Sequence, residues 1–306
     1  MGRIPTLAAA AVLIAIAPGG ARGQVQPDAG RIQQELERGR VPGPAPRTPA
    51  APVIEEPVRP ALTAPASARF LVNGFRITRN TAFAEAELLA LLKEFIGKEL
   101  SLADLQRAAD VITRVYRERG YFVARAYVPA QDIKDGIVEI TVLEGKLDRV
   151  SIRPTGETRL RDRIVEATLR AALPAHGLIR EDDLERGLLL LNDLPGVDVR
   201  SVLSPGAALG TSVVTAEVSE AALVSGNLDF DNYGNKFSGP YRLGAALSLN
   251  DPSGYGDLLS ARATASSGIS YGRLAYQVPL GHSGLRLGGA YAETHYELCC
   301  EFAPLQ

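Results

Sequence analysis

The sequence predicts an α+β chain that continues into an all-β membrane part: two tandem β-α-α-β-β modules, then the first strands of a transmembrane antiparallel barrel. Two observations predict this architecture. Between residues 67 and 220 the same order of strand and helix patterns occurs twice. Beyond residue 220 helical periodicity ends, and apolar and polar residues alternate with a period of two, which is typical of outer-membrane barrel strands.

Composition limits the functions to consider. The 306 residues have a formal net charge of −2, three histidines and two cysteines, Cys299 and Cys300, which are adjacent. The charge gives no nucleic-acid footprint, and an adjacent cysteine pair forms neither a disulfide framework nor a zinc site. We therefore expect no enzymatic activity, no cofactor and no metal site.

Residues 1–23 have the layout of a secretory signal peptide. An apolar run at 7–17 follows Arg3, and small residues Ala21 and Gly23 precede the cleavage point. Residues 24–40 then predict a short polar helix with Asp28 as a possible N-cap. Residues 41–66 hold eight prolines and predict an extended linker, either a tether for that helix or a plain spacer.

The first module is predicted at residues 67–147. Its expected elements are a strand at Arg69–Ile77, a helix at Glu85–Phe95, a helix from the N-cap Ser101 to Gly120, and strands at Tyr121–Val128 and Ile137–Leu143.

The second module is predicted at residues 148–220 and repeats that order. Its expected elements are a strand at Arg149–Arg153, helices at Arg161–Leu173 and Arg180–Leu194, and strands at Val197–Leu203 and Ser212–Val218.

Residues 221–306 predict about five alternating strands separated by Gly- and Ser-rich turns. Small residues on the outward face and a polar opposite face with arginines favour the wet lumen of a barrel over a soluble β-sandwich. The arginines are Arg242, Arg262, Arg273 and Arg286. Two interpretations stay open: they line a path for a hydrophilic chain, or they are ordinary polar residues of the wall. A closed membrane barrel needs at least about eight strands, so we expect that the chain is a fragment or that the barrel is completed from outside it.

Several stretches resemble one family. The most specific are Arg119-Gly-Tyr-Phe-Val-Ala-Arg-Ala-Tyr-Val-Pro-Ala-Gln-Asp132, Gly136-Ile-Val-Glu-Ile-Thr-Val-Leu-Glu-Gly145, Asp231-Asn-Tyr-Gly234, Asn250-Asp-Pro-Ser-Gly-Tyr-Gly-Asp257 and Pro279-Leu-Gly-His-Ser-Gly-Leu-Arg-Leu-Gly288. The chain resembles the outer-membrane transporters of two-partner (type V) secretion, the haemolysin secretion/activation proteins of the ShlB/FhaC/HecB type. Cys299-Cys300 departs from the family pattern, which has Gly after Tyr296-Glu-Leu298.

The resemblance implies a plug-like N-terminal helix, a linker, two periplasmic POTRA modules and a 16-stranded barrel in the outer membrane of a Gram-negative cell. It implies a monomeric pore in lipid that exports one unfolded exoprotein without ATP. The POTRA modules would bind that partner's N-terminal secretion domain.

In the family's fold the strand after the second helix of each module is an edge strand. An exposed edge can take up an extended client by β-augmentation, because main-chain groups bind with little regard to sequence. The candidate exoprotein-binding residues on these edges are Phe122, Val123, Ala124, Arg125, Ala126, Tyr127, Val128, Val197 and Val199. The alternative is that these strands only complete the core.

Two other functions remain open at this point. The same modules could serve an outer-membrane assembly or insertion factor, although such factors usually have more POTRA modules and lack a Pro-rich linker. If the chain is really this short, it could act as a periplasmic client-binding fragment. A neighbouring gene for a large repetitive exoprotein would favour the transporter.

Overall fold

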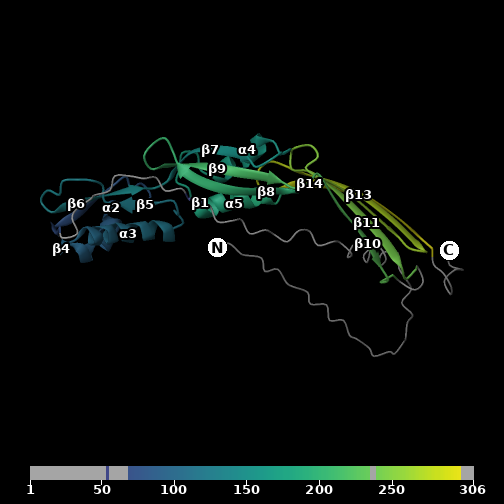
Figure 1. Ribbon diagram of the computed structural model, residues 1–306, viewed down its shortest axis with the longest axis horizontal. Helices are drawn as coiled ribbons and strands as arrows, with labels where there is room; N and C mark the ends of the chain where they lie inside the picture. The colour runs from purple at the N-terminus through teal and green to yellow at the C-terminus, as the bar shows by residue number, and fades with distance from the viewer. Residues whose placement is uncertain (1–52, 55–67, 235–238, 298–306) are drawn as a thin grey trace, which may run out of the picture. The chain divides into compact units, whose positions relative to one another are not determined.

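The computed structural model describes residues 53–54, 68–234 and 239–297 (Figure 1). The predicted signal peptide, the N-terminal helix, most of the linker and the cysteine pair lie outside the described residues. Of the linker, the structure describes a two-residue strand, β1 (Val53–Ile54). Within the described ranges, no helix combines the length and the apolarity needed to cross a membrane.

The first module contains two small sheets and two α-helices. Its elements are β2 (Phe70–Val72), β3 (Gly74–Thr78), α2 (Glu85–Leu91), the 3-10 turn η1 (Lys93–Phe95), β4 (Lys98–Leu100), α3 (Leu102–Glu118), β5 (Arg125–Tyr127) and β6 (Ile137–Leu143). The main sheet has the order β3-β6-β5, with β3 parallel and β5 antiparallel to β6.

Two predicted elements of this module differ from the structure. The single strand expected at 69–77 is divided at Asn73, because the N–H groups of Asn73 and Gly74 both donate to the carbonyl of Gly136 (2.8 and 3.3 Å). As a result β2 pairs with β4, a strand that the sequence does not predict, while β3 pairs with β6. The helix expected to reach Phe95 is α-helical only to Leu91.

Helix α3 begins as predicted at Ser101. The Ser101 hydroxyl accepts from the Asp104 N–H (3.2 Å), and the Asp104 carboxylate accepts from the Ser101 N–H (2.8 Å), which completes a capping box. The inner face of the helix, including Leu105, Ile112 and Tyr116, is fully buried against the sheet.

The second module has the same topology. Its elements are β7 (Lys146–Pro154), α4 (Asp162–Ala172), α5 (Glu181–Asn192), β8 (Val197–Pro205) and β9 (Thr211–Glu220). The central strand β9 is parallel to β7 and antiparallel to β8, as β6 is to β3 and β5. Helices α4 and α5 bury Val165, Leu169, Leu184, Leu188 and Leu191 in its core.

The described residues beyond β9 form an antiparallel meander. Its strands, in sequential order, are β10 (Val224–Asp231), β11 (Arg242–Asn250), β12 (Leu258–Ala265), β13 (Ile269–Pro279) and β14 (Arg286–Tyr296) (Figure 1). Among the described residues, β10 and β14 each have one neighbouring strand, so this sheet is open and does not close into a barrel.

Candidate functional site

The predicted edge strand of the first module is shorter than expected. β5 covers Arg125–Tyr127 and pairs only with β6, so it does form an edge of the sheet. Phe122, Val123 and Ala124 are not part of a strand: they form the turn that follows α3.

Two of these turn residues have a different role. Phe122 and Val123 pack against the hydrophobic core of the second module. Gly145 makes this approach possible, since it has φ +72° and a Cβ placed there would lie 2.8 Å from the Val123 Cβ. The first part of the predicted binding segment therefore joins the two modules.

The central residue of β5 is already hydrogen-bonded within the module. The Ala126 N–H donates to the Thr113 hydroxyl of α3 (2.9 Å), and the Ala126 carbonyl lies 3.5 Å from the same oxygen. Ala126 and Val128 are buried at 4% and 3% exposure, whereas Arg125 is exposed. We call the Thr113 contact the β5 cap. It satisfies the main-chain N–H that an added strand would use.

The second module contains an equivalent contact. The Val199 N–H donates to the Asn192 Oδ1 (2.7 Å), and the Asn192 side-chain amide donates to the Val199 carbonyl (3.0 Å). Asn192 is the last residue of α5. We call this pair of bonds the β8 cap. The Val197 and Val199 side chains are buried in the core, so they offer nothing to a partner, and the main chain of Val199 becomes available only if the β8 cap opens.

The linker forms a strand on the same side of β8. β1 pairs with β8 in parallel, with Val53 opposite Val202 and Ile54 opposite Leu203, which gives the sheet order β1-β8-β9-β7. The expectation that Val197–Leu203 is a free edge is therefore wrong at its C-terminal end, because a segment of the chain itself is added there.

The meander has one apolar face that is exposed to solvent. The strand register places Leu228, Leu243, Leu247, Leu274, Tyr276, Leu287 and Tyr291 on that face. These side chains are between 45% and 82% exposed. An exposed apolar face on alternating antiparallel strands is typical of the lipid-facing side of a membrane barrel.

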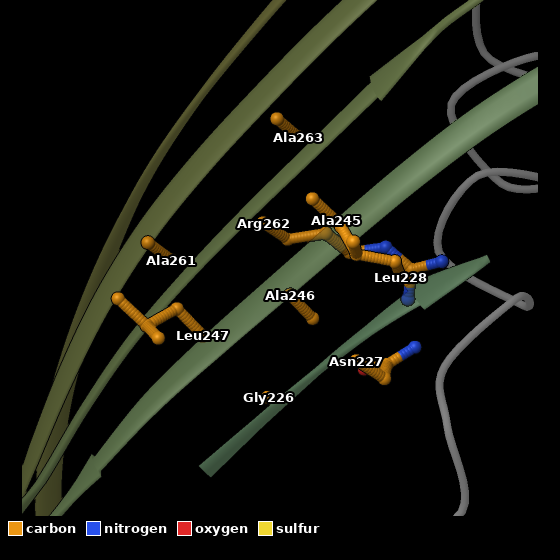
Figure 2. A pocket seen from close by; sticks show the side chains of 9 residues that line it. All are labelled: Gly226, Asn227, Leu228, Ala245, Ala246, Leu247, Ala261, Arg262 and Ala263. Atoms are coloured by element: carbon orange, nitrogen blue, oxygen red, sulfur yellow. The ribbon is translucent and has the colours of Figure 1, made fainter. Parts of the chain in front are cut away.

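The opposite face is polar. The register places the four predicted lumen residues, Arg242, Arg262, Arg273 and Arg286, together on this face. Arg242 forms an ion pair with its cross-strand partner Asp231 (2.9 Å). Figure 2 shows the long Arg262 side chain extending across the small residues of β11 toward β10. Arg286 differs from the others, since its guanidinium donates to the Asp193 carbonyl of the second module (2.7 Å).

The turn between β11 and β12 contacts the second module. The Asp257 carboxylate accepts from the Ser253 N–H within the turn (3.1 Å) and from the Tyr276 hydroxyl of β13 (2.9 Å). The Tyr255 hydroxyl accepts from both Arg161 and Arg163, and the Arg161 guanidinium lies 3.9 Å from the centre of its ring. We call the contact of Tyr255 with the two arginines the Tyr255 clamp. Through this clamp, the motif at 250–257 joins the β11–β12 turn to the second module.

The first module also contains a buried carboxylate, Glu144, within the motif that ends at Gly145. It accepts hydrogen bonds from the Thr81 N–H and hydroxyl, the Ala82 N–H (2.8 Å) and the Tyr116 hydroxyl (2.9 Å). Burial by itself would raise the pKa of Glu144, but these donors outweigh it and hold the pKa below its usual value. Burial, together with the bond to Glu144, raises the pKa of Tyr116.

Sequence reasoning missed the two caps, the Tyr255 clamp and Glu144. A threonine in the interior of an amphipathic helix and an asparagine at a helix end are weak signals, because such residues are common at these positions. Their partners lie in other elements, and periodicity carries no information on such pairs.

Comparisons with known proteins agree with this geometry. Residues 70–145 match a family of POTRA domains of the ShlB type, and residues 210–305 match the haemolysin secretion/activation proteins ShlB/FhaC/HecB. The heme/hemopexin transporter protein HuxB of Haemophilus influenzae is 30% identical over 291 residues, which cover 92% of this chain and 50% of HuxB. The haemolysin transporter protein ShlB of Serratia marcescens is 27% identical, over 80% of this chain and 44% of ShlB.

The fold is also similar to a solved structure. CdiB from Escherichia coli superposes with a TM-score of 0.58 at 27% sequence identity, over 87% of this chain and 47% of that protein. The chain spans about half the length of the curated relatives it matches.

A ShlB-type POTRA module followed by an antiparallel sheet that matches part of CdiB is the arrangement of outer-membrane proteins with POTRA domains. The chain belongs to the ShlB/FhaC/HecB family, the TpsB transporters of two-partner secretion. Members of this family lie in the outer membrane of Gram-negative bacteria with their POTRA domains in the periplasm. They are transporters and not enzymes, in agreement with the residue counts.

Proposed function

We propose that this chain takes part in the export of an unfolded exoprotein across the outer membrane, with the POTRA modules as the receptor and the β10–β14 sheet as part of the pore wall. In this proposal residues 148–220 form a second POTRA module, and the sheet belongs to a 16-stranded, monomeric barrel. The observation that carries the proposal is the two-faced meander: exposed leucines and tyrosines suit lipid on one face, and four arginines suit a wet lumen on the other.

The exoprotein's N-terminal secretion domain is proposed to add to the edges of β5 and β8. The β8 edge is the longer, with nine residues against three in β5. The addition of β1 supports this choice, since an extended segment pairs with β8 in this structure. Each main-chain hydrogen bond contributes about 1 kcal/mol net, so a few bonds give binding that a transporter can release.

The names of the relatives suggest classes of partner. HuxB is named as a heme/hemopexin transporter and ShlB as a haemolysin transporter. We propose a large secreted exoprotein of this general kind as the partner. Both matching family models are of the ShlB type, so no observation favours an assembly factor over a transporter.

Photo-crosslinking tests the two edges without disturbing the fold. A photoreactive amino acid replaces Arg125 on β5 or Arg200 on β8, both of which are exposed. The matched control is Arg153, which is exposed on β7 at the opposite end of the second sheet. We expect the secretion domain of the partner exoprotein to crosslink from Arg125 or Arg200 and not from Arg153. Crosslinking that is equal at all three positions would contradict edge binding.

A further inference from the structure

The linker strand β1 occupies part of the edge that the exoprotein is proposed to use. It covers β8 at Val202 and Leu203. Nearer the start of β8, the Asn192 side chain bonds both the N–H and the C=O of Val199. The outer edge of β8 is thus divided between a side-chain cap and a segment of the linker.

The sequence around β1 limits how firmly it can bind. Pro52 and Pro57 enclose the four residues Val53-Ile54-Glu55-Glu56. Proline has no N–H to donate to a sheet, so it restricts a strand to the residues between two prolines. Within residues 41–66, Val53-Ile54 is also the sole adjacent pair of β-branched residues, which favour strands. On this sequence pattern, Val53–Ile54 is the segment of the linker that most favours a strand.

We infer that Val53–Ile54 is an exchangeable internal strand, which occupies the β8 edge until an extended segment of an unfolded polypeptide takes its place. The client part of this inference rests on the proposed function. Because β1 belongs to the same chain, its pairing with β8 is intramolecular, and its effective concentration at β8 is set by the linker and not by the concentration of the protein. A client must therefore compete with the linker, so weak or unrelated segments are excluded from the edge.

A disulfide can lock the linker strand in place. Val53 and Val202 are opposite each other, and neighbouring strands lie about 4.8 Å apart, within the range that a disulfide spans. The variant Val53→Cys/Val202→Cys is made in the full chain with Cys299→Ser and Cys300→Ser, in detergent. The two single-cysteine variants are the controls. Failure of the intrachain disulfide to form under oxidation would overturn the β1–β8 register.

The probe is a fluorescein-labelled peptide with the sequence of residues 50–58, Ala-Ala-Pro-Val-Ile-Glu-Glu-Pro-Val. A second variant, Val53→Pro/Ile54→Pro, removes the competing strand without touching either module. We expect this variant to bind the peptide at least tenfold more tightly than the oxidised double-cysteine protein does. Reduction of the disulfide should restore intermediate binding. Equal binding in all states, or no binding in any, overturns the exchange.

The secretion domain of the partner exoprotein separates this inference from the proposed function. Binding of the domain that is weakened by the disulfide and strengthened by the proline variant supports competition at β8. If the domain binds equally in all states while the peptide does not, the client uses another surface and competition with the linker is overturned. If the domain binds in no state, the proposed receptor function fails, and the peptide result alone still decides whether β1 exchanges.

Discussion

The β8 cap provides the sharpest test of how this sheet edge is built. Replacement of Asn192 by leucine removes both hydrogen bonds to Val199, of 2.7 and 3.0 Å, and leaves the main chain of β8 unchanged. Val199 is 1% exposed, so water reaches its N–H and C=O poorly. Leucine is a better helix former than asparagine, so helix propensity acts in the opposite direction and cannot cause a loss of stability.

The expected loss follows from the two bonds. Each hydrogen bond contributes about 1 kcal/mol net, and a group left without a partner costs about 1–3 kcal/mol. We therefore expect Asn192→Leu to destabilise the second module by about 2 kcal/mol. Since about 1.4 kcal/mol corresponds to a tenfold change, local opening of β8 should become roughly 30-fold more frequent.

Hydrogen exchange followed by mass spectrometry measures this opening in the full chain. Peptides from β8 and β9 report on the cap, and peptides from β6 in the first module are an internal reference. Glu185→Leu is the matched control, because Glu185 is exposed on the same helix. Exchange of β8 amides within twofold of the unmodified chain would refute the assignment of Asn192 as an edge cap.

Three further outcomes are expected. Thr113→Val, which keeps the shape of the side chain, should destabilise β5 by about 1–3 kcal/mol because the buried Ala126 N–H loses its acceptor, seen as faster exchange of β5 and β6. Since the pKa of Glu144 is lowered in the fold, its carboxylate stabilises the first module at neutral pH, and this contribution is lost as the pH falls through the lowered value. Glu144→Gln should therefore lower the free energy of unfolding of the first module by about 2 kcal/mol at pH 7. It should also weaken the fall of that free energy toward acid pH, measured by urea unfolding with hydrogen exchange as the readout. Glu118→Gln, at an exposed position, should leave the pH dependence unchanged. Tyr255→Ala removes the hydroxyl acceptor and the ring of the Tyr255 clamp, and the loss of two cation–π contacts should cost about 1–2 kcal/mol. Hydrogen exchange at the start of α4 and in the β11–β12 turn should become faster. Unchanged exchange there would show that the clamp contributes nothing to stability.

Periodicity was sufficient to predict the elements that have one buried face. The helices of both modules and the strands of the meander were predicted, because their apolar residues recur at 3.6 or at 2 residues. The alternation also placed the four arginines on one face, as the strand register does. Such patterns record which side of an element is buried, and little else.

Features that depend on a single distant partner were not predicted. The break at Asn73 depends on the carbonyl of Gly136, and the turn at Phe122–Val123 is fixed by packing on the second module. The addition of β1 to β8 could not be foreseen, because a two-residue strand between prolines has no periodicity and its partner lies about 150 residues further along the chain. Edge strands themselves were predicted from the family's fold, whereas the caps that cover them were not.

The caps change what binding to these edges requires. In each module the helix before the edge strand supplies one side chain to a residue of that strand: Thr113 to Ala126, and Asn192 to Val199. The opposite edge strand of the first sheet, β3, is also capped by a helix side chain, because the Ile77 N–H donates to the Glu85 carboxylate of α2 (3.1 Å). Such covering protects an edge from pairing with other chains.

A client strand that replaces a cap exchanges one hydrogen bond for another, so the capped residue adds little to the affinity. The gain must come from residues on either side of the cap, and it grows with the length of strand that the edge can offer. β5 offers three residues and β8 offers nine, two of which pair with the linker. On this argument β8 is the main receptor edge, and release of β1 adds the further residues that a longer client segment needs.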